Sequence, residues 1–356
     1  MKQDASSDLH PEGAPVRWAF FFRLFLLAAA VIAAGLLVWK LSNLLLLAFG
    51  SILVAVLVRS FSALIERYTP LRSGTSLAAA TIAIAAFMAG FAILLGSQIQ
   101  TQFAQLFERA PDLIHALEDR FGVENLEDKL VEQIQQSIER TSLISNVAGL
   151  STTLFGSLAN LLLVMVAGIY LAADPRSYRR GFFLLFPRRA RREAAETLDV
   201  LYNALRLWLL GQLLSMFLVG AASAAGLWLL GIPSALALGV IAGLLEFVPV
   251  IGPILGAVPA VALALAESPV TAAWVALLYL VIQQLEGNLI MPLIQHRMVR
   301  LPPALTIFAI IGFGLLFGPL GILFATPLLV VVFVTVKKLW VRDTLDEDTK
   351  LPGETE

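Results

Sequence analysis

The chain has 356 residues, of which 58% are hydrophobic and only 14% are charged, whereas a soluble domain carries about 25% charged residues. Most of its surface must therefore face something other than water, which excludes a soluble enzyme. The net charge of −1, the absence of cysteine and three scattered histidines give no sign of nucleic-acid binding, disulfides, thiol chemistry or a metal site.

The alternation of apolar and polar stretches predicts an all-α polytopic membrane protein with about eight transmembrane helices. A bilayer core about 30 Å thick needs about 20 apolar residues in a helix, and several stretches of the chain meet this length. The predicted segments are a cytoplasmic N-terminal tail (1–16), the first three transmembrane helices (17–97), an amphipathic extracytoplasmic helical insert (98–150), a fourth transmembrane helix (151–173), a basic cytoplasmic loop (174–206), a C-terminal transport region with broken helices (207–336) and a cytoplasmic C-terminal tail (337–356).

Two polar stretches set the predicted orientation. In the insert 98–150, apolar residues recur at helical spacing and acids outnumber bases, which indicates amphipathic helices outside the cytoplasm. Residues 174–203 carry seven arginines, and the positive-inside rule places such a loop in the cytoplasm. Both termini are then predicted to be cytoplasmic. The arginines either set only this topology or also contact anionic lipid headgroups.

The last third of the chain contains an interrupted apolar segment, Glu246–Pro259, with three prolines and two glycines. Proline removes a backbone hydrogen bond, so this helix must break or kink. Freed backbone groups are tolerated in a membrane only when protein buries them or when they line a wet cavity. A carboxylate inside a membrane is energetically costly, so its presence there indicates a functional site. Glu246, Pro249, Gly252 and Pro253 are therefore candidate substrate or ion-binding residues.

A similar pattern recurs at Gly318-Pro319, followed by Thr326. A continuous helix over 303–336 would be about 51 Å long, far longer than the hydrocarbon core. We expect this segment to fold back as a re-entrant hairpin or to break at Gly318-Pro319. A pair of Gly/Pro-interrupted segments indicates a transporter's substrate site, so Gly318, Pro319 and Thr326 are also candidate substrate or ion-binding residues. Two kinked packing helices are the alternative.

Four polar side chains, Gln283, Gln284, Glu286 and Asn288, fall within six residues between these segments. Gln284 and Asn288 are spaced i, i+4 and share a face, while Gln283 and Glu286 share a neighbouring one. Interhelical hydrogen bonding would explain the amides. The carboxylate needs a cation, a proton or water, so all four are candidate substrate or ion-binding residues.

Three motifs together, 246–259, 283–292 and 312–327, resemble the signature of the autoinducer-2 exporter (AI-2E) family, as does the order of spans. The resemblance implies a gradient-driven exporter of a small solute, with autoinducer-2 as the candidate, in the bacterial inner membrane. A sodium or other cation/proton antiporter of the same family is the alternative. The resemblance to the family also implies a homo-oligomer, for which we expect five copies. It implies no cofactor beyond a coupling H+ or Na+.

Other classes of function fit the sequence less well. No phosphate-binding loop for ATP is present, and no His-Glu-x-x-His or Gly-x-Ser-x-Gly motif indicates an intramembrane enzyme. A passive channel or a membrane scaffold stays open. A scaffold would not need carboxylates beside broken helices, so neutralising Glu246 and Glu286 would leave its function intact.

Overall fold

The structure is a computed structural model that describes residues 15–87, 89–90, 143–291 and 301–352. These residues form α-helices, two short π-helices and connecting turns, and no strand occurs among them. The prediction of an all-α fold is confirmed. The chain divides into two compact units, Met1–Leu45 and Leu46–Glu356.

Five of the described helices are long and apolar enough to cross a bilayer, or up to six if one bent pair is a single span. The polytopic character is therefore confirmed, while the number eight stays a prediction. The predicted insert 98–150 lies largely outside the described residues.

The first unit contains α1 (Pro15–Lys40). At 26 residues this helix is about 39 Å long, enough to cross the hydrocarbon core. Its described side chains are exposed, including Phe20, Leu27 and Val38. A helix that is apolar on nearly all sides requires lipid or another apolar surface around it.

The second unit begins within α2 (Ser42–Tyr68) and continues through the helix Ser73–Phe87 and α5 (Leu143–Ala173). α5 packs closely on α2, because a Cβ on Gly168 would lie 2.6 Å from the side chain of Val54. The Arg59 Nε donates a 2.7 Å hydrogen bond to the carbonyl oxygen of Ala172. This bond occupies a carbonyl at the end of α5 that has no partner within the helix.

α6 (Pro175–Leu184) follows α5 after a bend of 91°. Asp174 caps its N-terminus, because the carboxylate accepts a 3.2 Å hydrogen bond from the backbone N–H of Ser177. Proline at the first helical position costs no hydrogen bond there. The local sequence Asp174-Pro175 therefore ends one helix and starts another in a new direction.

Removing this cap is expected to loosen the first turn of α6. Hydrogen bonds from the hydroxyl and the backbone N–H of Ser177 hold the pKa of Asp174 below its ordinary range. A lowered pKa in the folded state means that the stabilisation is present above the ordinary pKa and is lost as pH falls through the folded pKa. In Asp174→Ala, amide hydrogen exchange over 175–178 should be several-fold faster than in wild type at pH 7. This difference should vanish in acid, and equal rates at pH 7 would refute the capping role.

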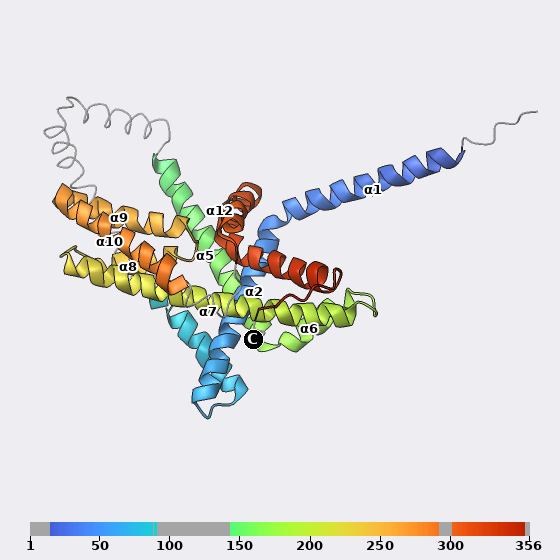
Figure 1. The fold of residues 1–356 in the computed structure, drawn as a ribbon, viewed down its shortest axis with the longest axis horizontal. Helices are drawn as coiled ribbons and strands as arrows, with labels where there is room; N and C mark the ends of the chain where they lie inside the picture. The colour runs from blue at the N-terminus through green and yellow to red at the C-terminus, as the bar shows by residue number, and fades with distance from the viewer. Residues whose placement is uncertain (1–14, 88, 91–142, 292–300, 353–356) are drawn as a thin grey trace, which may run out of the picture. The chain divides into compact units, whose positions relative to one another are not determined.

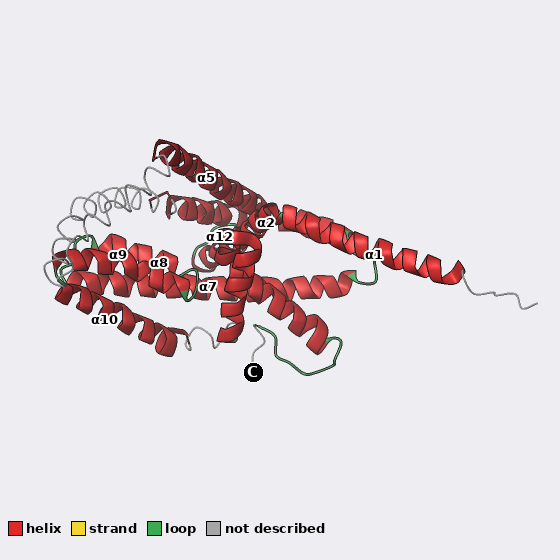
Figure 2. Ribbon diagram, turned by 90° about the horizontal axis from the view of Figure 1, so that it is seen from above, coloured by secondary structure: helices red, strands yellow, loops and turns green. Residues whose placement is uncertain are grey.

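Four helices lie side by side in both ribbon views (Figure 1, Figure 2). Glycines let two of them approach closely: a Cβ on Gly239 would lie 2.5 Å from the backbone nitrogen of Ala224, and one on Gly243 would lie 2.5 Å from the carbonyl oxygen of Met216. Small residues spaced four apart are typical of tight packing between membrane helices. The four helices are α7 (Arg191–Leu229), α8 (Ala235–Leu245), α9 (Ile251–Glu267) and α10 (Pro269–Leu285).

The last long helix, α12 (Pro303–Thr335), is not straight. Gly318 has φ 66° and ψ −150°, a region that essentially only glycine adopts. Residues eight apart in a straight helix are separated by about 12 Å along its axis, yet a Cβ on Gly321 would overlap the carbonyl oxygen of Phe313. The two limbs therefore meet at a sharp bend at Gly318. The π-helix η2 (Val336–Arg342) continues the second limb.

Candidate substrate and ion site

The first broken segment lies between α8, which ends at Leu245, and α9, which begins at Ile251. Val250 at its tip has φ 72° and ψ −52°, and the Ile251 N–H donates a 2.9 Å hydrogen bond to the carbonyl oxygen of Pro249. This is a γ-turn of the strained hand, which costs about 1–3 kcal/mol in a β-branched residue. Such strain clusters at ligand sites and switch regions, so the outlier makes this tip a candidate site.

Two glycines let α9 fold directly back on α8. A Cβ on Gly252 would overlap the carbonyl oxygen of Leu245, and one on Gly256 would lie 2.9 Å from the Cα of Ala242. Pro253 lies in the first turn of α9, where its missing N–H has no helical partner to lose. Gly252 and Pro253 therefore build the hairpin, and Pro249 supplies the carbonyl of its turn.

The structure brings Glu246 and Glu286 together, although they lie far apart in the chain. Their residues are only 2% and 6% exposed, and the two carboxyl groups are close enough to interact electrostatically. Glu286 accepts hydrogen bonds from Ser215 Oγ and Gln283 Nε2, both at 3.1 Å. Oε2 of Glu246 is buried without a hydrogen-bond partner in the described residues. The pair is therefore buried and only partly satisfied.

Among the described residues, no positive charge is paired with either carboxylate. In the part of the chain that the structure describes, neither carboxylate has a lysine or arginine within ion-pair distance. No group of three or more potential metal-ligating residues occurs there either. Two ionised carboxylates that share a water-poor site repel each other and lose their hydration. A proton or a single monovalent cation between them removes both costs.

α7 supplies one wall of the site through residues that share a helical face. Gln212 Nε2 donates a 2.7 Å hydrogen bond to the backbone carbonyl of Glu246, a group left free where α8 ends. The rings of Trp208 and Phe247 meet edge to face at 5.9 Å, and Ser215 contacts Glu286. Sequence reasoning missed Gln212 and Ser215. These two residues could have been recognised in the sequence as polar side chains at helical spacing in an otherwise apolar span.

The bend of α12 at Gly318 reaches the same apolar cluster as the first broken segment. Phe317 and Leu320, on either side of Gly318-Pro319, pack on an apolar cluster, and Phe247 of the first tip packs on it too. Thr326 is buried in the second limb of α12. Both broken tips therefore border one cluster. Its buried members are Leu46, Leu53, Val56, Ala204, Leu205, Trp208, Leu209, Phe324, Val330 and Val334.

Gln284 and Asn288 do not join the carboxyl pair. Both are exposed, and Asn288 Nδ2 donates hydrogen bonds to the Gln284 side-chain oxygen at 2.8 Å and to its backbone carbonyl at 3.0 Å. The shared face predicted for them is present, but the structure gives it no contact with the buried carboxylates. Glu286 opens the π-helix η1 (Glu286–Ile290), a feature that is frequent at functional sites.

These observations define a polytopic helical membrane protein with two broken helical segments that border one apolar cluster, and with a buried carboxyl pair at the first of them. The model of the family described as AI-2E family transporter matches residues 20–340, so the chain belongs to that family and the predicted resemblance is confirmed. Membership supports a role in membrane transport.

Three relatives illustrate the range of similarity. YueF of Bacillus subtilis (strain 168), provisionally named a transport protein, is 28% identical over 72% of this chain and 75% of its own length. YrrI of the same organism, also provisionally named so, is 29% identical over 44% of this chain and 45% of its own length. The AI-2 transport protein TqsA of Escherichia coli (strain K12) is 23% identical over 59% of this chain and 61% of its own length.

Proposed function

We propose that this protein is a gradient-driven secondary transporter that exports a small solute across the bacterial inner membrane. In this proposal the Glu246–Glu286 pair binds the coupling proton or cation. The observation that supports it most is the meeting of two buried carboxyl groups that have no basic partner among the described residues. A scaffold gains nothing from such a pair, because buried unpaired charge is costly. The relative TqsA is named an AI-2 transport protein, which makes autoinducer-2 our candidate solute.

The broken helical segments supply the polar groups that a transported ion needs beside these carboxylates. α8 ends and α9 begins at the Glu246 tip. The partial negative charge at the C-terminus of α8 and the partial positive charge at the N-terminus of α9 therefore both lie at this tip. Helix ends of this kind recognise ions and charged substrate groups in transporters with interrupted helices. The strained turn at Val250 gives the first tip a second conformation at low energetic cost.

A cation/proton antiporter is the second candidate, and one observation favours it. Among the described residues, three polar side chains hydrogen-bond to these two glutamates, Gln212, Ser215 and Gln283, which offers few hydrogen bonds to a sugar-like diol. Competition between a proton and a sodium ion for the same two carboxylates would be sufficient for antiport without a solute site.

The wild-type protein in liposomes distinguishes these candidates. The liposomes enclose a pH-sensitive dye, and a proton or sodium gradient is imposed before autoinducer-2 is added. We expect autoinducer-2 to accumulate above its external concentration only under a gradient. Sodium-driven proton movement without autoinducer-2 would identify the antiporter instead. Solute or ion flux down its own gradient alone would show a channel, and no flux would leave a scaffold.

The hydrogen bond from Ser215 is expected to tune the affinity of the pair. In Ser215→Ala, Glu286 loses one of its two donors, so its carboxylate should hold a proton or cation differently. We expect the half-saturating concentration of the coupling ion to change several-fold while the maximal rate is kept. Ser223, which is buried on the same helix and bonds to neither carboxylate, provides the control Ser223→Ala. Equal effects of the two variants would contradict this role.

A further inference from the structure

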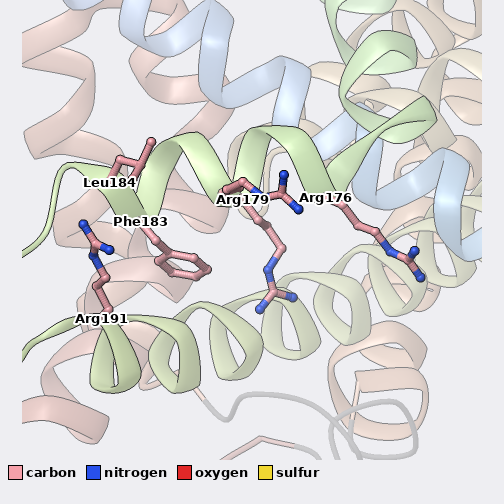
Figure 3. A pocket seen from close by; sticks show the side chains of 6 residues that line it. Arg176, Arg179, Phe183, Leu184 and Arg191 are labelled. Atoms are coloured by element: carbon pink, nitrogen blue, oxygen red, sulfur yellow. The ribbon is translucent and has the colours of Figure 1, made fainter. Parts of the chain in front are cut away.

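A second charged site lies between α6 and the start of α7, and it does not include the carboxyl pair. A cavity of about 450 Å³ is bordered there by four arginines, together with Phe183 and Leu184. Figure 3 shows Arg179 and Phe183 extending from α6 toward α7, while Arg191 extends from the first turn of α7. The arginines are Arg176, Arg179, Arg180 and Arg191.

Helical spacing collects these charges. Arg176, Arg179 and Arg180 stand at i, i+3 and i+4 of α6, so they share one face. Two guanidinium groups are held by neighbours: Arg179 pairs with Asp199 at 2.7 Å, and Arg191 Nε donates to the Phe186 carbonyl at 3.1 Å.

The other two arginines of the cavity have fewer hydrogen-bond and ion-pair partners among the described residues. Arg176 lies near Asp174, and Arg180 has no hydrogen bond or ion pair with any residue that the structure describes. The arginines outnumber the nearby acids Asp174 and Asp199, which leaves an excess of positive charge facing the cavity.

The remaining face of α6 is apolar. Tyr178, Phe182 and Leu185 lie about one turn apart on it and are 50%, 44% and 80% exposed. Because α6 bends 91° away from α5, an α5 that crosses the bilayer places α6 along the membrane surface. A short helix with aromatic residues on one face and arginines on the other is typical of the lipid interface.

We propose that this arginine cavity binds the phosphate of an anionic phospholipid headgroup, while Tyr178, Phe182 and Leu185 insert beside its acyl chains. Guanidinium groups bind phosphate with paired, charge-assisted hydrogen bonds. The positive-inside rule assigns these arginines to the cytoplasmic leaflet, where anionic lipids supply such phosphates. The lipid thereby fixes the depth of α6 and the start of α7, the helix that carries Gln212 and Ser215. This lipid site does not depend on the identity of the transported solute.

Native mass spectrometry of the full chain in detergent tests the proposal. Wild type, Arg176→Gln/Arg180→Gln and Arg188→Gln/Arg189→Gln are each mixed with equal amounts of phosphatidylglycerol and phosphatidylcholine. The second double variant removes the same charge from the same loop, but neither of its residues borders the cavity. The four substituted arginines, Arg176, Arg180, Arg188 and Arg189, are all exposed, so both double variants should fold. An unchanged elution volume in size-exclusion chromatography checks this.

We expect wild type and Arg188→Gln/Arg189→Gln to retain phosphatidylglycerol several-fold more than phosphatidylcholine, and Arg176→Gln/Arg180→Gln to lose this preference. Equal loss in the two double variants would overturn the site in favour of diffuse charge attraction. Displacement of the lipid by millimolar inorganic phosphate would assign the cavity to a free anion instead. Glu246→Gln and Glu286→Gln should leave lipid retention unchanged. The lipid experiment therefore tests the arginine cavity independently of the transport proposal.

Discussion

Glu246→Gln and Glu286→Gln are each expected to lower gradient-driven transport in liposomes by about tenfold or more, a rise of at least about 1.4 kcal/mol in the rate-limiting barrier. Glutamine keeps the size of the side chain but cannot hold a proton or a cation as a carboxylate does. Because the two groups share one buried site, either substitution should remove coupling. Proton flux and solute flux, measured together, check this.

The same variants are expected to be at least as stable as wild type. Replacing a buried carboxylate that has no basic partner among the described residues with a neutral group removes a desolvation cost. A melting temperature that holds or rises while transport falls separates a functional loss from misfolding. Glu267→Gln is the matched control, because Glu267 is an exposed carboxylate at the far end of α9. Full transport in both site variants would rule out the carboxyl pair as the coupling site.

Gly252→Ala and Gly321→Ala are expected to destabilise the α8–α9 turn and the bend of α12 strongly. In each case the new methyl group would overlap a backbone carbonyl oxygen, of Leu245 or of Phe313, and a backbone atom cannot rotate aside. Overpacking of this kind costs about 1–3 kcal/mol, so the melting temperature should fall by several degrees, with loss of transport.

Gly312→Ala is the control for both glycine variants. A methyl group there meets nothing within 4 Å, and alanine favours a helix over glycine by about 1 kcal/mol. Its melting temperature should hold or rise. Scanning fluorimetry of the purified proteins in detergent measures all three. Wild-type stability in Gly252→Ala or Gly321→Ala would contradict the close approach of the limbs.

The breaks in the chain could be predicted from the sequence because they have local causes. Proline removes a hydrogen bond in the interior of a helix, so the interruption near Pro249 and Pro253 and the break at Gly318-Pro319 were predictable. The sharpness of the bend at Gly318 could not be predicted from local sequence. It depends on how closely Gly321 approaches Phe313, which is a tertiary contact.

The composition of the site could be predicted only in part. Glu246 and Glu286 were marked by their cost in a membrane, but their meeting depends on how α10 packs on α7 and α9. The same packing selects Gln212 and Ser215 from an apolar span and leaves Gln284 and Asn288 exposed. The strained dihedrals fall on Val250, a residue type that gives no local indication of a positive φ.

The most direct test of the carboxyl pair as the coupling site is a count of the protons that the purified protein exchanges with a weakly buffered solution. Autoinducer-2 and sodium chloride are added separately, with choline chloride as the salt control. We expect at least one of the two ligands to change the bound protons by about one per chain, and Glu246→Gln/Glu286→Gln to show no change. The absence of exchange in wild type, or the same exchange in the double variant, would show that this pair does not bind the coupling ion.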